Sequence, residues 1–421
     1  MTMTEPTTPL LRNADLRRYL AARVVSVAGS AVTYVAMPVL VYAITGSAAW
    51  TSLVVVAQGL PYLLFGLWAG AVADHVARKR MMVVADLTAA LTLATIPAAW
   101  WNGQLTAAHV IAVAFTVQTV FVFFDAANFG ALPSLVPRLR LPAANSLVLG
   151  SCMVVESVVP GLTGALLVVS APATLVAVDA VSFLASALLI RSIIRPFSGA
   201  RDRGTGSPSS LSAIGEGLRF IRRHAIVRSM TVVSGLQAFG GGAFVAVVVV
   251  WADDSFGIRD GDARLGLFYG SWGCGALLGA MLMPRVVARF GGPRTALYFV
   301  PLSAAAGLAV AVMPNWWSAV LALVCWGATF VLIAINAVTV RQQVTPEPMM
   351  SRVMTTGRML TFGAGYPLGA FTAGMLAERY GAVTSMLVCM LSLVASAFYA
   401  WSSPLRTAPR MLALPPEPVT P

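Results

Sequence analysis

The stretch GLWAGAVADHVARKR, residues 66–80, ends one apolar run of the sequence and begins the next with a compact cluster of charge. Because Gly66 and Gly70 have no side chain, we expect another helix to approach this segment closely. Asp74 stands where the apolar run stops, and three consecutive basic residues follow at 78–80, within about two helical turns of Gly70. A charge cluster between two apolar runs marks a connection at a membrane surface, so it sets the orientation of the chain.

The composition of the whole chain indicates the same environment. Of its 421 residues, 58% are hydrophobic and only 10% are charged. This is too little polar side chain to cover a soluble globule, so the composition predicts a polytopic membrane protein. The four cysteines are not closely spaced and the three histidines are far apart, so we expect no disulfide framework and no metal site. We expect no cofactor either.

Twelve apolar runs follow one another along the chain, and each has about 20 residues or more, enough to cross the hydrocarbon as a helix. They are 18–45, 49–73, 81–101, 106–128, 145–169, 173–190, 229–252, 265–284, 294–313, 316–340, 353–377 and 382–403. The sequence therefore predicts an all-α membrane protein with twelve transmembrane helices in two pseudo-symmetric halves. The expected parts are a tail at 1–16, a six-helix half at 17–190, a linker at 191–228, a second half at 229–403 and a tail at 404–421.

Basic residues are distributed asymmetrically between the connections. If the N-terminus is cytoplasmic, all of the 28 Lys and Arg residues except Arg259, Arg264 and Arg379 fall in tails, even-numbered connections or helix ends on that side. The positive-inside rule then predicts a cell-membrane protein with both termini in the cytoplasm. Topology and attraction to anionic membrane lipid account for the net charge of +12, so nucleic-acid binding is not expected.

The long polar connection at 191–228 has two parts. The first, RSIIRPFSGARDRGTGSPSSL at 191–211, has the composition of a flexible linker. In the second, Ile214, Leu218, Ile221 and Val227 recur near helical spacing beside arginines, which predicts a helix on the cytoplasmic membrane surface. A solvated linker helix is the alternative.

The spacing Gly70-xxx-Asp74-xxx-Arg78, followed by two more basic residues, resembles the cytoplasmic loop between helices 2 and 3 of the major facilitator superfamily of secondary transporters. Its position after the second apolar run is the same. At the matching place in the second half, GAMLMPRVVARFGGPR at 279–294 keeps glycine and arginine but lacks the acid. Duplicated halves of this kind bind substrate near the membrane midplane between them.

Longer stretches resemble the macrolide-efflux and enterobactin-exporter branch of drug:proton antiporters in that superfamily. They are RVVSVAGSAVTYVAMPVLVYAITGSA at 23–48, LPSLVPRLRLPAANSL at 132–147, VDAVSFLASALL at 178–189 and GEGLRFIRR at 215–223. This resemblance covers nearly the whole chain and implies proton-driven export of a small molecule by a monomer. The sequence departs from it in helix 5, where family antiporters often carry Gly-Pro-xx-Gly-Gly and this chain reads VPGLTG at 159–164. Two glycines are replaced, so this motif does not by itself support antiport.

Acidic residues inside the predicted spans are the candidates for chemistry, since a charge near the membrane centre costs about 2.5–3.5 kcal/mol on insertion scales and is usually functional. Glu156 is the deepest, midway along the fifth span and one helical turn before Pro160. Because a low-dielectric environment favours the neutral form of a carboxyl group, Glu156 is the predicted proton carrier. A permanently neutral carboxyl, hydrogen-bonded to a hydroxyl such as that of Ser157, is the alternative.

The superfamily resemblance also implies a gating latch on the cytoplasmic side. In the superfamily, the arginine four residues after the loop aspartate can pair with an acid at the inner end of helix 4, and Arg78 and Asp125 stand at the matching positions. Asp74 would face the start of helix 11, near 352–356, where free N–H groups favour an anion. Together with Gly70, these residues would stabilise the state closed to the cytoplasm.

Two more acids and two bases lie inside the spans. Asp86, near the inner end of the third span, either joins the latch or extends to the interface. Asp179, in the sixth span, is expected to pair helices through a hydroxyl or an amide. Arg23 and Arg358 are expected to be anchors or latch partners, because both lie near the inner interface.

The substrate cavity is predicted from polar and aromatic residues on the spans that line it in the superfamily. They are Tyr34, Gln237, Phe239, Asn336 and Tyr366, and each could equally serve ordinary helix packing. A cavity with few charges and several aromatic or Met residues favours a bulky amphiphile or hydrophobic cation over a sugar or a polyanion.

Other functional classes have less support. An ATP-driven pump needs a phosphate-binding loop with Gly-Lys followed by Ser or Thr, and Lys79, the only lysine, is flanked by arginines. An intramembrane enzyme needs a convergent His/Asp or Ser/His set, and His109 stands at an outer helix end without one, so enzymatic activity is not expected. No motif supports a channel or a receptor. A proton-coupled importer or lipid facilitator of the same fold remains the alternative, since loop motifs do not determine direction.

Overall fold

The computed structural model describes residues 10–128, 131–137, 140–197, 210–258, 262–346 and 349–408. The N-terminal half contains α1 (Ala14–Thr45), α2 (Ala48–His75), α3 (Arg78–Trp101), α4 (Ala107–Asn128), the short α5 (Leu132–Leu135), α6 (Leu141–Leu166) and α7 (Pro172–Ser192). After α8 (Ser210–Arg223), the C-terminal half contains α9 (Ala225–Phe256), α10 (Ala263–Phe290), α11 (Gly292–Val312), α12 (Trp316–Val344), α13 (Met350–Arg358), α14 (Tyr366–Tyr380) and α15 (Ala382–Ser402). Among the described residues, eleven helices are long and apolar enough to cross a membrane.

The remaining crossing, the eleventh in chain order, contains a π-helical segment between two α-helical parts. The apolar run predicted at 353–377 consists of α13, a π-helical segment at Met359–Gly365 and α14. A π-helical turn is wider than an α-helical turn and often occurs at functional sites. The backbone stays helical through it, so residues 350–380 together are long enough to cross a membrane. With this crossing included, the predicted fold of twelve membrane helices in two halves of six is confirmed.

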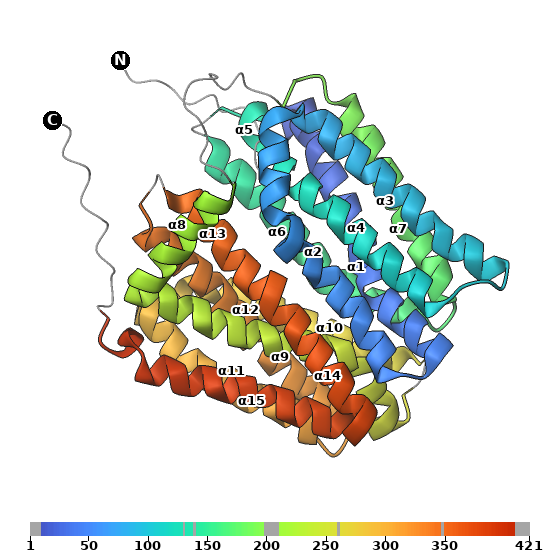
Figure 1. Ribbon diagram of the computed structural model, residues 1–421, viewed down its shortest axis with the longest axis vertical. Helices are drawn as coiled ribbons and strands as arrows, with labels where there is room; N and C mark the ends of the chain where they lie inside the picture. Colours follow the sequence, from blue (N-terminus) through green and yellow to red (C-terminus); the bar gives the residue numbers. More distant parts are fainter. Residues whose placement is uncertain are drawn as a thin grey trace.

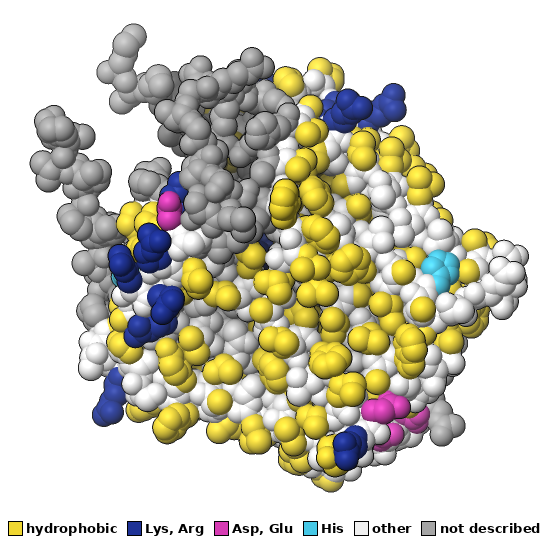
Figure 2. Space-filling model, in the orientation of Figure 1, with side chains coloured by type: hydrophobic (Ala, Val, Ile, Leu, Met, Phe, Trp, Pro, Cys, Tyr) yellow, Lys and Arg dark blue, Asp and Glu magenta, His cyan; other side chains and the backbone are white. Residues whose placement is uncertain are grey.

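The two halves lie side by side (Figure 1). At one end of the bundle, α1 begins and α2 ends, and the basic residues at 78–80 lie there. We call this the basic end and the opposite one the far end. Apolar side chains are spread over the face shown in Figure 2, and charged side chains lie near its edges. Such a surface suits contact with lipid, so the chain is a multi-pass membrane protein.

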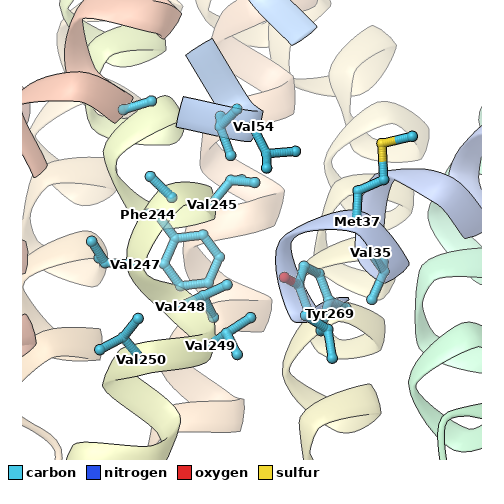
Figure 3. Packing of buried hydrophobic residues seen from close by; sticks show 14 of the residues in the cluster. Val35, Met37, Val54, Phe244, Val245, Val247, Val248, Val249, Val250 and Tyr269 are labelled. Carbon is cyan, nitrogen blue, oxygen red and sulfur yellow. The ribbon is translucent and has the colours of Figure 1, made fainter. Parts of the chain in front are cut away.

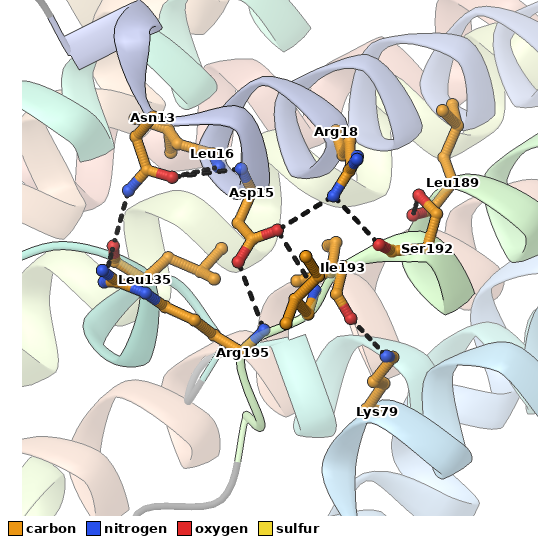
Figure 4. A network of polar contacts seen from close by, with 11 residues as sticks. Asn13, Asp15, Leu16, Arg18, Lys79, Leu135, Leu189, Ser192, Ile193 and Arg195 are labelled. Carbon is orange, nitrogen blue, oxygen red and sulfur yellow. Dashed lines mark hydrogen bonds and ion pairs between the residues drawn. The ribbon is translucent and has the colours of Figure 1, made fainter.

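Polar contacts at the basic end fasten the N-terminal half together (Figure 4). The carboxylate of Asp15 accepts hydrogen bonds from the backbone N–H groups of Ile194 and Arg195, at 3.1 and 3.2 Å. Lys79 donates to the carbonyl of Ile193. The lysine of the 66–80 stretch therefore ties the start of α3 to the chain that leaves α7.

Buried apolar residues form one shared core toward the far end. This core joins residues of α1 and α2 to residues of α9 and α10, among them Val35, Val54, Phe244 and Tyr269 (Figure 3). Toward the basic end, the buried apolar residues form separate clusters, one in the N-terminal half and others in the C-terminal half. The halves are thus packed against each other mainly at the far end.

Glycines on α6 confirm close packing between the halves at the far end. A β-carbon at Gly164 would meet the Cα of Gly266, and one at Gly161 would meet the Cα of Gly270, so the backbones of α6 and α10 touch. On the same helix but nearer the basic end, a β-carbon at Gly150 would find no described heavy atom within 4 Å. The two helices therefore separate toward the basic end.

Glycines on α2 show the same gradient. Gly59 lies against the ring of Pro367 in α14, whereas the nearest described atom to a β-carbon at Gly66 is the Cγ of Met359, at 3.9 Å, and none lies within 4 Å at Gly70. The expected close approach of another helix to Gly66 and Gly70 is therefore not met in this conformation, because the two halves diverge toward the basic end.

The helix expected in the second part of the 191–228 connection is α8. It packs on α13, where Arg352 and Glu216 form an ion pair and Gly217 lies against the backbone of Arg352. At the junction with α9, the ring of His224 accepts a hydrogen bond from the N–H of Val227, and burial lowers the pKa of His224. Most of the expected flexible part, 198–209, and the side chain of Ile214 lie outside the described residues.

Candidate functional site

A cavity of about 330 Å³ lies between the two halves, midway along the helices. It is lined by Ser30, Thr33, Tyr34, Met37, Gln58, Gly59, Tyr62, Ala114, Val117, Gln118, Phe121, Asp179, Phe183, Arg358, Phe362 and Tyr366. Six of these residues are aromatic, and the charged ones are Asp179 and Arg358. A mostly apolar lining with a few polar groups is typical of a site for a small organic ligand.

An ion pair bounds the cavity on its basic-end side. A guanidinium nitrogen of Arg358 in α13 lies 3.0 Å from Oδ2 of Asp125 in α4. Tyr62 of α2 accepts a hydrogen bond from Arg358 at 3.1 Å and donates one to Asp125 at 3.3 Å, and the Arg358 guanidinium stacks 4.8 Å from the Tyr62 ring centroid. These contacts join the two halves.

The π-helical segment brings residues of the C-terminal half to the cavity. Arg358, Phe362 and Tyr366 follow one another at four-residue spacing and all line it. A wide helical turn keeps residues at this spacing nearly on one line. The hydroxyl of Tyr366 lies 2.6 Å from that of Tyr34 in α1, so a hydrogen bond crosses between the halves inside the cavity.

Glu156, the predicted proton carrier, lies on α6 outside the lining of this cavity. Its side chain is exposed and lies within electrostatic range of Arg23 in the N-terminal half and Arg358 in the C-terminal half. It therefore faces the space between the halves, on the basic-end side of the cavity. The hydroxyl of Ser157 donates to the carbonyl of Met153, 2.8 Å away.

Asp86 and Asp179 lie inside the N-terminal half, each only 1% exposed. Asp86 is therefore buried and does not extend to the interface. It is within electrostatic range of Arg23 and Asp179, and Arg23 itself lies over the ring of Phe124, 5.3 Å from its centroid. Ser182 donates a hydrogen bond to Oδ1 of Asp179 at 2.9 Å, but both residues lie on α7, so this contact is not the pairing between helices that was expected for Asp179.

The remaining predicted residues are placed as follows. Tyr34 and Tyr366 line the cavity, whereas Gln237, Phe239 and Asn336 do not. Gln237 accepts from Ser303 at 3.0 Å, Asn336 donates to the carbonyl of Gly292 at 2.9 Å, and Phe239 packs on the shared core. The hydrogen bonds of Gln237 and Asn336 therefore lie within the C-terminal half.

Two predicted latch residues belong to the 66–80 stretch. The side chain of Asp74 is outside the described residues; Arg78 begins α3 and is half-buried.

Several lining residues were not singled out from the sequence. Gln58 and Tyr62 are four residues apart on α2, and Gln118 and Phe121 are three apart on α4, so each pair lies on one helix face. Polar and aromatic residues at this spacing within otherwise aliphatic spans would have indicated them. Arg358 was expected to be an anchor or a latch partner, but the sequence indicated Arg78 rather than Arg358 as the partner of Asp125.

Comparison with known proteins identifies the family. The model of the transmembrane secretion effector family matches residues 4–417. The chain belongs to this family of the major facilitator superfamily. The superfamily resemblance read from residues 66–80 is thereby confirmed.

Among relatives, the multidrug efflux pump Tap of Mycolicibacterium fortuitum is 28% identical over 392 residues, covering 91% of this chain and 94% of its own. Tap of Mycobacterium tuberculosis (strain H37Rv) is 26% identical over 410 residues, covering 94% of each. Among solved structures, a mutant of the nucleoside transporter NupG has a TM-score of 0.74 at 13% identity, covering 91% of this chain and 99% of its own. A bacterial homologue of the human lysosomal transporter Spinster, in an inward-facing and unoccupied conformation, has a TM-score of 0.73 at 15% identity. The match covers 96% of this chain and 98% of the homologue. At these identities the structures show a shared fold alone.

Proposed function

We propose that the protein exports small amphiphilic or hydrophobic compounds across the cell membrane by proton antiport, with alternating access. This proposal rests on the aromatic cavity between the two halves, which are packed together at the far end and diverge toward the basic end. The multidrug efflux activity named for the Tap relatives supports it. One chain contains both halves and the cavity, so a monomer surrounded by lipid suffices.

The basic end is cytoplasmic in this proposal, with both termini on that side. The support is the placement of the basic residues, since the positive-inside rule puts such connections in the cytoplasm. The conformation described above is then the inward-facing one, from which the cavity receives its substrate. Export requires that the basic end close and the far end open.

Glu156 carries the proton in this proposal. As a carboxylate it attracts Arg358, which belongs to the other half and is already paired with Asp125. When Glu156 takes up a proton, this attraction between the halves is lost. Proton binding and the relative movement of the halves are thereby coupled.

The latch at the cytoplasmic side consists of Gly70, Asp74, Arg78, Asp86 and Asp125. In the outward-facing state, Gly70 and Asp74 would come close to the start of α13, where free backbone N–H groups favour a carboxylate. The Asp74→Asn variant should therefore slow transport and leave substrate binding nearly unchanged. A large loss of binding affinity in that variant would contradict the latch.

The proton assignment is tested with Glu156→Gln in membrane vesicles that carry the full-length protein. Drug-driven proton release should be abolished, while the variant remains inserted and folded. Asp254→Asn, which changes an exposed acid at the far end, is the matched control and should retain proton release. Unchanged release from the Glu156→Gln vesicles would refute the assignment, and transport in the opposite direction would favour the importer alternative.

A further inference from the structure

A second cavity, also of about 330 Å³, lies at the basic end, where α8 meets α9. No step of the proposed transport cycle uses it. Its lining consists of Glu216, Arg219, Phe220, Arg223, His224 and Met349. Since these residues belong to α8 or directly precede α9 and α13, we call it the α8 cavity.

Two arginines give the α8 cavity a positive wall. Arg219 and Arg223 are four residues apart, so they lie on one face of α8, and both are exposed. No described ion pair includes either of them. Beside them, Nδ1 of His224 accepts the hydrogen bond from the N–H of Val227, so the neutral ring keeps its Nε2–H as a donor. The wall therefore offers positive charge and hydrogen-bond donors to an anion.

The acid among the lining residues, Glu216, does not cancel this charge. It is held in the ion pair with Arg352 of α13, which is not itself part of the lining. Glu216 and Arg352 neutralise each other, so the charges of Arg219 and Arg223 remain in excess. The charges of the cavity therefore favour a small anion over a neutral or cationic ligand.

The α8 cavity also has an apolar side. Phe220 and Met349 pack on a buried apolar cluster at the junction of α8, α9 and α13. Leu218, next to Arg219, is 38% exposed. The helix that follows directly, α9, is long and apolar enough to cross a membrane. The cavity therefore lies near the level at which lipid headgroups meet the protein.

These features together favour one class of anion. Guanidinium groups bind phosphate oxygens through two parallel hydrogen bonds, which makes phosphate a suitable ligand for the arginine wall. A phosphate that is free in solution has the same chemistry. The apolar side, the exposed Leu218 and the start of a membrane helix favour instead a phosphate that carries acyl chains, because basic pockets beside membrane helices bind anionic headgroups.

We propose that the α8 cavity binds the phosphate headgroup of an anionic phospholipid from the leaflet at the basic end, through Arg219 and Arg223. The bound lipid fixes α8 to the membrane surface. Because α8 is tied to α13 by the Glu216–Arg352 ion pair and by the contact of Gly217 with the backbone of Arg352, the lipid also steadies the helix that ends at Arg358. The site depends neither on the direction of transport nor on the identity of the proton carrier.

The test measures lipid binding to the purified full-length protein by native mass spectrometry. The probes are dioleoyl-phosphatidylglycerol and dioleoyl-phosphatidylcholine, which have the same acyl chains and differ in headgroup charge. The wild type should retain the anionic lipid in preference to the zwitterionic one. The double variant Arg219→Gln/Arg223→Gln should bind phosphatidylglycerol about tenfold or more weakly, with binding of phosphatidylcholine nearly unchanged.

The double variant Arg285→Gln/Arg289→Gln is the matched control. It removes two exposed arginines with the same four-residue spacing near the end of α10, and neither lines the α8 cavity. Its binding of phosphatidylglycerol should stay within about twofold of the wild type. Equal losses in the two double variants would show only a general attraction to surface charge and would overturn the site, as would undiminished binding by Arg219→Gln/Arg223→Gln.

Two further arms separate charge from fold and lipid from free phosphate. Arg219→Lys/Arg223→Lys keeps the charge and should retain most of the binding; a loss as large as that of the glutamine pair would overturn the role of charge. Phosphatidylglycerol should raise the melting temperature of the wild type but not that of the glutamine pair, since a ligand stabilises the state that binds it. Millimolar inorganic phosphate should do neither this nor displace the lipid, and if it does both, the cavity binds soluble phosphate and the lipid assignment is wrong.

Discussion

The two ends of the interface between the halves are built differently. At the far end, α6 and α10 touch through glycines, and a shared apolar core joins the halves. On the basic-end side of the cavity, the ion pair between Asp125 and Arg358 joins them, and beyond it the apolar clusters are separate. Close backbone packing is effective in a membrane because apolar side chains gain little by leaving lipid. A partly exposed ion pair contributes less and can exchange partners, so we expect the far end to be the more firmly closed in this conformation.

The largest expected effect is that of Gly164→Leu, which places a side chain where α6 touches the backbone of α10 at Gly266. Overpacking at a close contact costs about 1–3 kcal/mol. We expect the variant to separate the halves at the far end, lower the melting temperature of the purified protein and abolish export.

Gly150→Leu is the matched control on the same helix. A β-carbon there would find no described heavy atom within 4 Å, so its melting temperature should stay close to that of the wild type. Equal destabilisation by both variants would contradict the difference between the two ends.

Gly70→Leu should have the second largest effect, and it should affect transport rather than stability. No described atom lies within 4 Å of a β-carbon at Gly70, so this conformation accommodates the larger side chain. If the basic end closes during the cycle, the leucine blocks that closure. Substrate binding measured in detergent should be retained while export is lost, and normal export would show that no helix approaches Gly70 in any state.

Asp125→Asn removes the charge that pairs with Arg358. Because the arginine side chain is 44% exposed, we expect this change to weaken the contact by about 1 kcal/mol. Transport should change several-fold while the protein stays folded, and the effect should shrink in a background with Tyr62→Phe, since Tyr62 bonds to both partners. Additive effects of the two substitutions, measured as export rates, would exclude a single network.

Tyr366→Phe should have the smallest effect. It removes one hydroxyl from the hydrogen bond between Tyr34 and Tyr366, and such a bond contributes about 0.5–1.5 kcal/mol. Export should fall by no more than about tenfold, with the melting temperature nearly unchanged. Complete loss of export would mean that this hydroxyl contacts the substrate or the proton.

The order of the helices could be predicted from the sequence because each span is a long apolar run bounded by polar residues. Which residues face the cavity was harder to predict, since membrane helices are apolar on all sides and their rotation leaves a weak pattern. For this reason Gln237 and Asn336 were expected in the cavity but make contacts within the C-terminal half. The π-helical segment at Met359–Gly365 was not predicted, although it contains Gly363 and Gly365 and directly precedes the sequence Tyr366-Pro367, where a backbone N–H is missing.

The embedded acids illustrate the same limit. Depth along a span is visible in the sequence and singled out Glu156, but the partners of a carboxyl group are set by other helices. Asp125 pairs with Arg358, which is 233 residues away, and Asp179 borders the cavity because Gly29 lets α1 pack directly on α7. Contacts between distant segments of this kind follow only from the fold.

Alternation between the two ends is tested most directly by distances between spin labels in reconstituted protein lacking its native cysteines. One pair, at Arg80 and Arg285, reports on the basic end, and another, at Gln104 and Asp254, reports on the far end; all four positions are exposed. When substrate is added under a pH gradient, we predict that the basic-end distance shortens while the far-end distance lengthens. If both distances stay fixed, or both change in the same direction, the account of alternating closure is contradicted.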